Sequence, residues 1–320
     1  MKDYEKMRTL SYKKDFSLKP ILALLNLLDN PHHSLNFIHV AGTKGKTSVC
    51  HYLSLLAQKS QQTPVGLYTS PHLESLSERI QINGIPVEEK MIEDKIEKIK
   101  ELAKKHDLTL TFFEVITACA FLIFKEKQAK IVILETGLGG RLDTTNVVTP
   151  LFCVLTPIHK DHTQLLGKCL FKIAKEKGGI LKPHIPFFVA KQKKRIKGFL
   201  RLLGKIKKAP FYPYSKFYTQ ILSPFLYQIK REDLCYLYEG PQYGLENFLF
   251  ALGIAKKMEW KLPLKESIKH FVLGRFEVYQ NQKISLVLDG AHNPFAIKKL
   301  VQSLKIAFQD KKWVFVFNAF

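Results

Sequence analysis

The chain has 320 residues, 46% of them hydrophobic and 24% charged, which suits one large or two smaller globular domains and argues against a disordered protein. Its formal net charge of +22, carried mostly by lysine, is typical of a protein whose ligands are anions. Nucleic acid is one such ligand, but the sequence contains no zinc finger, basic zipper or RNP-type motif. A lysine-biased composition explains the charge more simply, so we expect no nucleic-acid partner.

The five cysteines and the N-terminal residues indicate the cellular compartment of the protein. No cysteine pair has CxxC or CxxH spacing, which argues against a disulfide framework and favours a reducing compartment. The N-terminus lacks the apolar segment of a secretory signal, and no apolar run approaches the roughly 20 residues that span a bilayer. We therefore expect a cytoplasmic protein with no membrane partner.

A glycine turn between a strand and a helix is the first functional motif. After a predicted helix at residues 18–28, an apolar strand at 37–41 leads into GTKGKTS at 42–48, and helical spacing follows. Glycines let backbone N–H groups approach an anion, and a helix N-terminus adds a favourable dipole. Lys46 can reach terminal phosphates, and Thr47 or Ser48 can offer a hydroxyl to Mg²⁺.

We therefore predict a site for nucleotide phosphates in this turn, formed by Gly42, Thr43, Lys44, Gly45, Lys46, Thr47 and Ser48. The G-x-x-G-K-T spacing is two residues shorter than the common Walker A loop. A solvated turn with an exposed lysine is the alternative.

Strands and helices alternate along most of the remaining chain. We predict strands at residues 63–68, 130–135, 151–156 and 187–190, a hairpin turn at 82–84, and helices at 87–105, 114–124, 168–177, 191–208 and 243–257. Such alternation predicts an α/β protein with a doubly wound, mostly parallel sheet whose ligands bind at the carboxyl ends of the strands. Residues 212–239 have the aromatic and proline content of a small antiparallel patch.

The last part of the chain reads as a second, shorter domain. We place a boundary near residue 274, which gives an ATP-binding domain at 1–273 and part of a C-terminal domain at 274–320. Residues 276–320 suffice for one β-α-β unit, with strands at 284–288 and 313–317 around a helix at 295–308, whereas domains are typically ~50–250 residues. We expect an incomplete domain, either because the sequence is a fragment or because a partner covers the remainder.

Several acidic and basic side chains follow predicted strands. Glu135 ends a strand next to a glycine turn, where its carboxylate can meet the Mg²⁺ of the phosphate loop from the opposite side. Asp161 and His162 follow another strand, and Lys177 ends the next helix; that lysine can bind metal only if neutral or carbamylated. Beyond the predicted boundary, Arg275 could bind a phosphate bidentately.

The order of the motifs resembles the dihydrofolate synthase/folylpolyglutamate synthase family of the Mur ligase superfamily. The matching runs include HVAGTKGKTS (39–48), TSPHLESLSERIQING (69–84), LETGLGGRLDTTN (134–146) and LDGAHNP (288–294). The resemblance implies a P-loop-type central domain, an incomplete Rossmann-like C-terminal domain and an ATP-dependent amide ligase. Such enzymes phosphorylate a pteroate or folate carboxylate, and the amino group of L-glutamate then attacks the acyl phosphate.

The family's functional residues can be carried over onto matching positions. The resemblance implies that Lys46, His162 and Lys177 act in catalysis. It implies two Mg²⁺ ions, one held by Ser70 and Glu135 and the other by His162 and a carbamylated Lys177. It also implies nucleotide contacts from Asn247, Arg275, Asp289 and His292, and a pterin pocket formed by Thr111, Phe113, Asp143 and Thr144. A monomer is the family expectation.

Three positions depart from the family motifs. Thr47 stands where glycine is common, Gly178 where the motif has alanine, and Gly244 where it has glutamine. We expect dihydropteroate as the first acceptor, with reduced folates in addition. Folylpolyglutamate synthase activity alone and a nucleotide-binding remnant without ligase activity are the alternatives.

Overall fold

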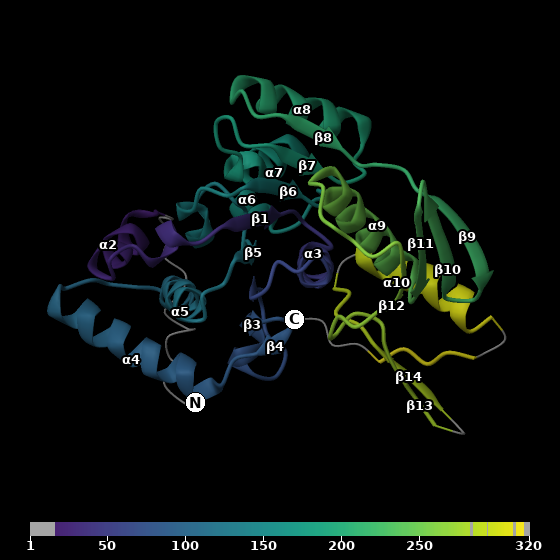
Figure 1. Ribbon diagram of the computed structural model, residues 1–320, viewed down its shortest axis with the longest axis horizontal. Helices are drawn as coiled ribbons and strands as arrows, with labels where there is room; N and C mark the ends of the chain where they lie inside the picture. The colour runs from purple at the N-terminus through teal and green to yellow at the C-terminus, as the bar shows by residue number, and fades with distance from the viewer. Residues whose placement is uncertain (1–16, 282–283, 293, 310–311, 317–320) are drawn as a thin grey trace. The chain divides into compact units, whose positions relative to one another are not determined.

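The computed structural model describes residues 17–281, 284–292, 294–309 and 312–316 (Figure 1). Its internal contacts divide the chain into two units, Met1–Tyr214 and Ser215–Phe320. The boundary that the sequence suggests near residue 274 falls inside the second unit and stays a prediction. Within the described ranges, no helix combines the length and the apolar character needed to cross a bilayer.

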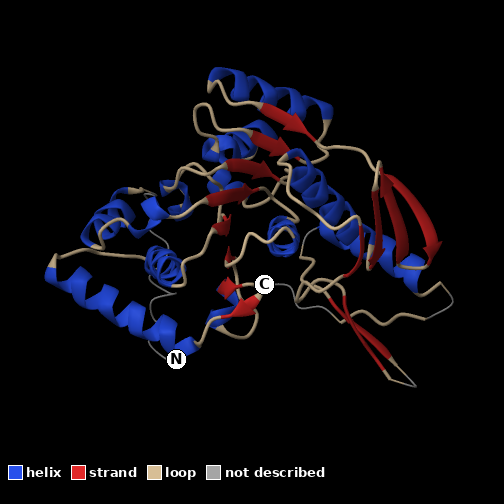
Figure 2. Ribbon diagram, viewed as in Figure 1, coloured by secondary structure: helices blue, strands red, loops and turns tan. Residues whose placement is uncertain are grey.

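An eight-stranded sheet organises the first unit (Figure 2). Its order is β4-β3-β2-β5-β1-β6-β7-β8, in which β2, β5, β1, β6, β7 and β8 are parallel. At one edge β3 pairs in antiparallel fashion with β2, and β4 with β3. The strands are β1 (Phe37–Ala41), β2 (Val65–Tyr68), β3 (Ile80–Ile82), β4 (Ile85–Pro86), β5 (Ile131–Glu135), β6 (Phe152–Leu155), β7 (Phe187–Val189) and β8 (Phe211–Pro213). The predicted α/β class and mostly parallel sheet are confirmed.

The central strands are buried along their whole length. Every residue of β1 and β5 is buried, as expected for apolar runs in a parallel sheet that is covered on both faces. The covering helices are α2 (Lys19–Leu27), α3 (Lys46–Lys59), α4 (Glu89–Lys105), α5 (Phe112–Glu126), α7 (Leu170–Lys177) and α8 (Lys194–Ile206). The charged helix α4 buries Ile92, Ile96 and Ile99 along one stripe, so its other side faces solvent.

The second unit contains a smaller sheet with a helix packed against it. The strands β9 (Tyr218–Ser223), β10 (Leu226–Arg231) and β11 (Leu234–Glu239) are antiparallel, as the sequence predicts. A fourth strand, β12 (Lys265–Lys269), which the sequence did not reveal, pairs in parallel with β11. The helix α9 (Gln242–Lys257) joins β11 to β12, and the ring of its Phe248 stacks on Tyr236 and Tyr238.

The end of the chain differs from the predicted β-α-β unit. The strand β14 (Ser285–Leu288) pairs in antiparallel fashion with β13 (Glu277–Gln280), and the helix α10 (Pro294–Ala307) follows. Residues 313–316 form no strand, and residue 317 lies outside the described ranges, so the predicted strand pair is wrong there. The hairpin needs only a short connection, closed by the hydrogen bond from Ile284 N–H to Asn281 Oδ1 at 2.8 Å, whereas a parallel pair needs a long crossover.

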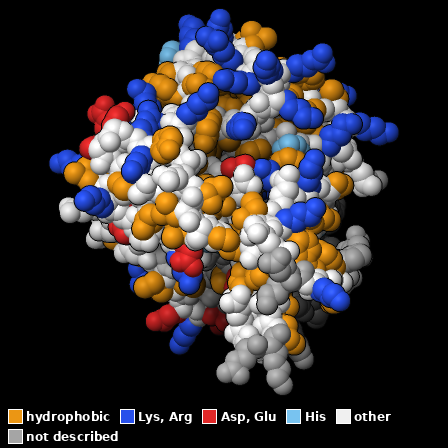
Figure 3. All heavy atoms as spheres, turned by 90° about the vertical axis from the view of Figure 1, so that its right-hand side faces the viewer, with side chains coloured by type: hydrophobic (Ala, Val, Ile, Leu, Met, Phe, Trp, Pro, Cys, Tyr) orange, Lys and Arg blue, Asp and Glu red, His pale blue; other side chains and the backbone are white. Residues whose placement is uncertain are grey.

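Lysine and arginine side chains are most numerous over the upper half of the molecular face in Figure 3 and sparser toward its lower end. Apolar side chains lie between them on this face.

Candidate functional site

The turn after β1 has the geometry of an anion-binding loop. Gly45 has φ +78° and immediately precedes α3, a left-handed conformation that glycine adopts without strain. Gly42 lies against the end of β6, because a Cβ atom on it would be 1.8 Å from Thr156 Oγ1. The first turn of α3 begins at Lys46, and a first helical turn leaves its N–H groups without partners inside the helix. These donors and the helix dipole suit a phosphate.

The first half of the loop is fastened to the segment that follows β6. The N–H groups of Thr43 and Lys44 donate to the carbonyl oxygen of Pro157 at 3.0 and 3.3 Å. The Thr43 hydroxyl donates to the carbonyl of His159 at 3.2 Å and accepts from its N–H at 3.1 Å. The ammonium group of Lys44 lies 3.3 Å from Asp161 Oδ2. These contacts hold Thr43 and Lys44 against the segment after β6. The N–H groups at the start of α3 are therefore the ones that we expect to bind an anion.

A buried carboxylate lies beside that helix end. Glu135, at the end of β5, accepts hydrogen bonds from the Thr47 hydroxyl at 3.0 Å and from the Ser70 N–H at 3.3 Å. Lys46 Nζ lies 3.8 Å from Glu135 Oε1. The structure therefore brings Lys46 and Thr47, which the sequence assigned to phosphate, next to Glu135 and the backbone of Ser70, which it assigned to the first Mg²⁺. Carboxylate and hydroxyl oxygens beside a phosphate site are the donors that Mg²⁺ prefers, so these residues fit that ion.

Lys177 reaches the same loop from the end of α7. Its Nζ donates to the carbonyl oxygen of Gly42 at 2.8 Å, and the side chain is buried. Burial, reinforced by the nearby charge of Lys46, lowers the pKa of Lys177 to about 7. A lysine in this setting exists partly as the neutral amine near neutral pH.

His162 lies in a left-handed turn just before the short helix α6 (Thr163–Leu166). Its φ is +48°, its N–H donates to Asp161 Oδ1 at 3.0 Å, and burial lowers the pKa of its half-exposed ring. In the part of the chain that the structure describes, no group of three His, Cys, Asp or Glu side chains is arranged to hold a metal. The assignment of a second metal to His162 and Lys177 stays a prediction.

Two of the predicted pterin residues, Asp143 and Phe113, contact the turn after β5. Asp143 is buried; its Oδ2 accepts from the N–H of Leu138 at 2.8 Å, and its Oδ1 accepts from the N–H of Thr145 at 3.0 Å and its hydroxyl at 2.5 Å. Burial raises the pKa of Asp143 above its ordinary value, and these three donors oppose the shift. Phe113 packs on Gly137 so closely that a Cβ atom there would be 2.6 Å from its Cζ.

The other two predicted pterin residues have local structural contacts. Thr111 begins α5 in a capping box with Glu114, in which the Thr111 hydroxyl accepts from the Glu114 N–H. Thr144 is the first residue of the 3₁₀ helix η3 (Thr144–Val147). Pterin contacts from these side chains stay predictions.

In the second unit, Asp289 is the centre of a hydrogen-bonded turn. Its Oδ2 accepts from the Tyr243 hydroxyl at 2.5 Å and from the Phe276 N–H at 2.9 Å, and its Oδ1 accepts from the Ala291 N–H at 2.8 Å. Arg275 Nη1 donates to the carbonyl of Gly274 at 2.8 Å, and the N–H of Gly290 donates to the same oxygen. The turn thus brings Arg275 and Asp289 together.

His292 and Asn247 are neighbours in sequence of residues that form this turn. The His292 Nδ1 atom lies 2.9 Å from the carbonyl oxygen of Gly290, and Asn247 lies one helical turn after Tyr243 on α9. The Tyr243 contact was missed by sequence reasoning, and its spacing from Asn247 on one helix face was the available signal.

Known proteins place the chain in a family. A Bacillus subtilis protein named dihydrofolate synthase/folylpolyglutamate synthase is 34% identical over 338 aligned residues, which span 95% of this chain and 76% of the relative. The chain belongs to the dihydrofolate synthase/folylpolyglutamate synthase family. No protein-family model matches it. The resemblance that the sequence motifs indicate is thereby confirmed.

Solved structures of this family agree with the fold. Folylpolyglutamate synthase from Thermotoga maritima is 33% identical, with a TM-score of 0.80 over 96% of this chain and 75% of that chain. The protein of an FPGS-AMPPCP-folate complex is 28% identical, with a TM-score of 0.83 over 96% of this chain and 81% of that chain.

Each departure from the family motifs has a partner in the structure. The Thr47 hydroxyl donates to Glu135, which a glycine could not do. At Gly178, a Cβ atom would be 2.5 Å from Leu203 Cδ2, so α8 packs directly over the end of α7. At Gly244, a Cβ atom would be 2.2 Å from the Tyr238 hydroxyl, so that hydroxyl occupies space that a side chain at this position would need.

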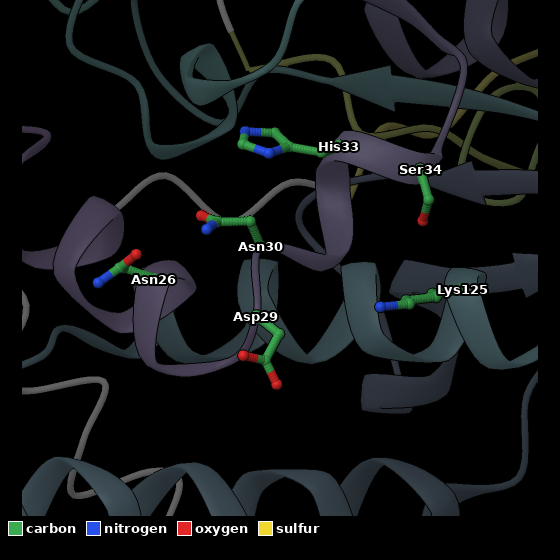
Figure 4. Close-up of a pocket in the computed structure, with 6 residues that line it drawn as sticks. All are labelled: Asn26, Asp29, Asn30, His33, Ser34 and Lys125. Carbon is green, nitrogen blue, oxygen red and sulfur yellow. The ribbon is translucent and has the colours of Figure 1, made fainter.

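A polar hollow lies away from this site (Figure 4). It is lined by Asn26, Asp29, Asn30, His33, Ser34 and Lys125. These residues come from the end of α2, the turn that follows it, the 3₁₀ helix η1 (Pro31–Ser34) that precedes β1, and the C-terminal end of α5. Most of them precede the amino end of β1, whereas the phosphate loop follows its carboxyl end, so the hollow is separate from that loop.

Proposed function

We propose that this chain is an ATP-dependent amide ligase that joins L-glutamate to dihydropteroate, and to reduced folates, through an acyl phosphate. The cluster of Lys46, Thr47 and Glu135 at the N-terminus of α3 carries the proposal, because the geometry of an anion-binding loop there lies beside a carboxylate of the kind that Mg²⁺ prefers. The names of the family members and the relative solved with AMPPCP and folate support the same assignment.

The chemistry explains why such a site is needed. A carboxylate is a poor electrophile, and phosphorylation gives it a leaving group that glutamate can displace. Phosphoryl transfer is promoted mainly by positioning and by stabilisation of negative charge. Lys46 and the N–H groups that begin α3 would bind the transferring phosphoryl group. Phe113 would stack on the pterin ring, and Asp143 would accept a hydrogen bond from its amino group.

We assign the first metal to Glu135 and Ser70, with the Thr47 hydroxyl beside them, and the second to His162 and Lys177. Mg²⁺ at these positions would neutralise charge on the phosphate oxygens. Lys177 would serve as a ligand after its neutral amine has added to CO₂, which forms an N–C bond and releases a proton. The lowered pKa of Lys177 supports this step, because only the neutral amine reacts.

We also assign nucleotide contacts to four residues of the second unit, Asn247, Arg275, Asp289 and His292. Tyr243 and the surrounding N–H groups hold Asp289 in place before a nucleotide arrives, which supports a binding role for that carboxylate. The proposal includes a monomeric, cytoplasmic enzyme with no nucleic-acid or membrane partner.

Turnover by the purified 320-residue chain tests the proposal. The assay contains ATP, Mg²⁺, bicarbonate, L-glutamate and dihydropteroate, and follows ADP release together with the mass of the product. We expect ADP release that depends on both acceptor and glutamate, and a product heavier by one glutamyl residue. Turnover with tetrahydrofolate alone would instead indicate a folylpolyglutamate synthase. ATP binding with no turnover on either acceptor would indicate a nucleotide-binding remnant.

A further inference from the structure

A histidine is buried in the middle of the central strand, where an apolar side chain would be expected. His39 lies on β1 between two parallel neighbours, and its side chain is fully buried. Burial lowers the pKa of His39 to about 3, so the ring is neutral. Its Nε2 atom lies 2.8 Å from the hydroxyl of Thr145, while its Nδ1 atom has no hydrogen-bond partner among the described residues. Burying an imidazole with only one of its two nitrogens hydrogen-bonded costs free energy, because the other nitrogen loses its contact with water. That cost suggests a role for the one hydrogen bond that the ring makes.

The direction of the hydrogen bonds follows from the number of protons. The Thr145 hydroxyl has one hydrogen and lies 2.5 Å from Asp143 Oδ1, which also accepts the Thr145 N–H. An ionised carboxylate has no hydrogen to donate, so the Thr145 hydroxyl donates its hydrogen to Asp143. The hydroxyl must then accept from His39, which fixes the Nε2–H tautomer of the ring. A chain of two directed hydrogen bonds therefore runs from His39 through Thr145 to Asp143.

The two hydrogen bonds end at Asp143, the carboxylate assigned to binding of the pterin substrate. A carboxylate can accept about four hydrogen bonds. The protein supplies two donors to Asp143 Oδ1 and one, the N–H of Leu138, to Oδ2. Oδ2 thus keeps capacity for a donor from a ligand, while Oδ1 is held by Thr145.

We propose that His39 is a positioning residue for the acceptor: its Nε2–H orients the Thr145 hydroxyl, which holds the Asp143 carboxylate for the amino group of the pterin ring. The inference rests on the proposed function, because it takes the pterin as the ligand of Asp143. His39 lies on β1, which ends at Ala41, and Gly42 follows directly. One buried strand thus leads to the phosphate loop and supports the acceptor site.

Two substitutions at His39 separate positioning from simple packing. His39→Met removes the N–H donor and puts an apolar side chain of similar length in its place. His39→Gln keeps an N–H donor. We expect His39→Met to raise the KM for dihydropteroate about tenfold, with kcat and the KM for ATP nearly unchanged. The reason is that the lost hydrogen bond affects only the contact between the Asp143 carboxylate and the pterin ring. His39→Gln should stay within about twofold of the wild type. A purely structural histidine would lower the thermal stability in both variants without a selective change in that KM.

Thr145 provides a second route if His39→Met does not fold. Thr145→Val removes the hydroxyl and should raise the same KM, whereas Thr145→Ser retains the hydroxyl and should not. In the double variant, His39→Met should add nothing to the effect of Thr145→Val, because the histidine then has no hydroxyl to orient. Additive effects, or an unchanged KM in folded His39→Met, would overturn the inference while wild-type turnover stands. A wild-type chain that neither binds nor converts dihydropteroate would overturn the proposed function and this inference with it.

Discussion

The amine of Lys177 donates a hydrogen bond at 2.8 Å to the carbonyl oxygen of Gly42, a residue 135 positions earlier in the chain. The contact joins the end of α7 to the start of the phosphate loop. It is buried, and the lowered pKa of Lys177 means that its protonation changes near neutral pH. The shape of the phosphate loop and the charge state of Lys177 are therefore linked.

The stability of the protein should depend on pH through Lys177. Burial lowers the pKa of this amine from 10.5 to about 7, so between these values the unfolded chain binds a proton that the folded chain does not. The free energy of unfolding should rise with pH across that window, by at most about 1.4 kcal/mol per pH unit, and the dependence should vanish below pH 7. Urea unfolding of the wild type and of Lys177→Met at several pH values measures this. A difference between the two proteins that stays constant with pH would contradict the prediction.

Gly42 should tolerate no side chain. Gly42→Ala would place a Cβ atom 1.8 Å from Thr156 Oγ1 and 3.1 Å from the Thr156 carbonyl carbon, at φ +155°. We expect a loss of about 1–3 kcal/mol in the free energy of unfolding and weaker binding of an ATP analogue. Gly198→Ala is the matched control, because Gly198 lies in helix α8 with open space around it. That change should stabilise the protein by about 0.5–1 kcal/mol. Equal effects of the two substitutions would argue against a constrained loop.

Glu135 should be needed for turnover rather than for folding of the sheet. Glu135→Gln keeps the shape of the side chain but removes the charge that faces Lys46 and the proposed Mg²⁺. We expect kcat to fall by about 10²–10³-fold, with a higher Mg²⁺ concentration needed for half-maximal activity. Steady-state assays over a range of Mg²⁺ concentrations test this. Glu126→Gln, which breaks an ion pair with Lys95 on the surface, should leave both quantities unchanged.

Tyr243 should affect the nucleotide through Asp289. Tyr243→Phe removes the hydroxyl that donates to Asp289 Oδ2 and leaves the ring in place. We expect the KM for ATP to rise about tenfold, since a hydrogen bond to a charged group is lost. Tyr279→Phe is the control in the same unit, because that hydroxyl contacts Glu277 at an exposed position on β13. If both variants bind ATP equally well, Asp289 has no nucleotide role that depends on Tyr243.

Local patterns predicted most of the first unit because each is set by neighbouring residues. Continuous apolar runs at β1 and β5 and the glycine turn before Lys46 require no information from distant parts of the chain. The elements that sequence reasoning missed have weaker patterns. The strand β12 reads KESIK and β13 reads EVYQ, and both are largely exposed, so neither shows the apolar alternation of a half-buried strand.

The sequence by itself determined the α/β class, the phosphate loop and the family, because residue order and motif spacing carry that information. It also supplied the candidate side chains for metal, nucleotide and acceptor. Only the tertiary structure decided which of them meet: Lys177 with Gly42, Thr47 with Glu135, and His39 with Asp143 through Thr145. The physical reason is that these contacts join segments separated in sequence, and hydrogen bonds and desolvation depend on distance in space. The packing of the sheet, which no local pattern contains, sets those distances.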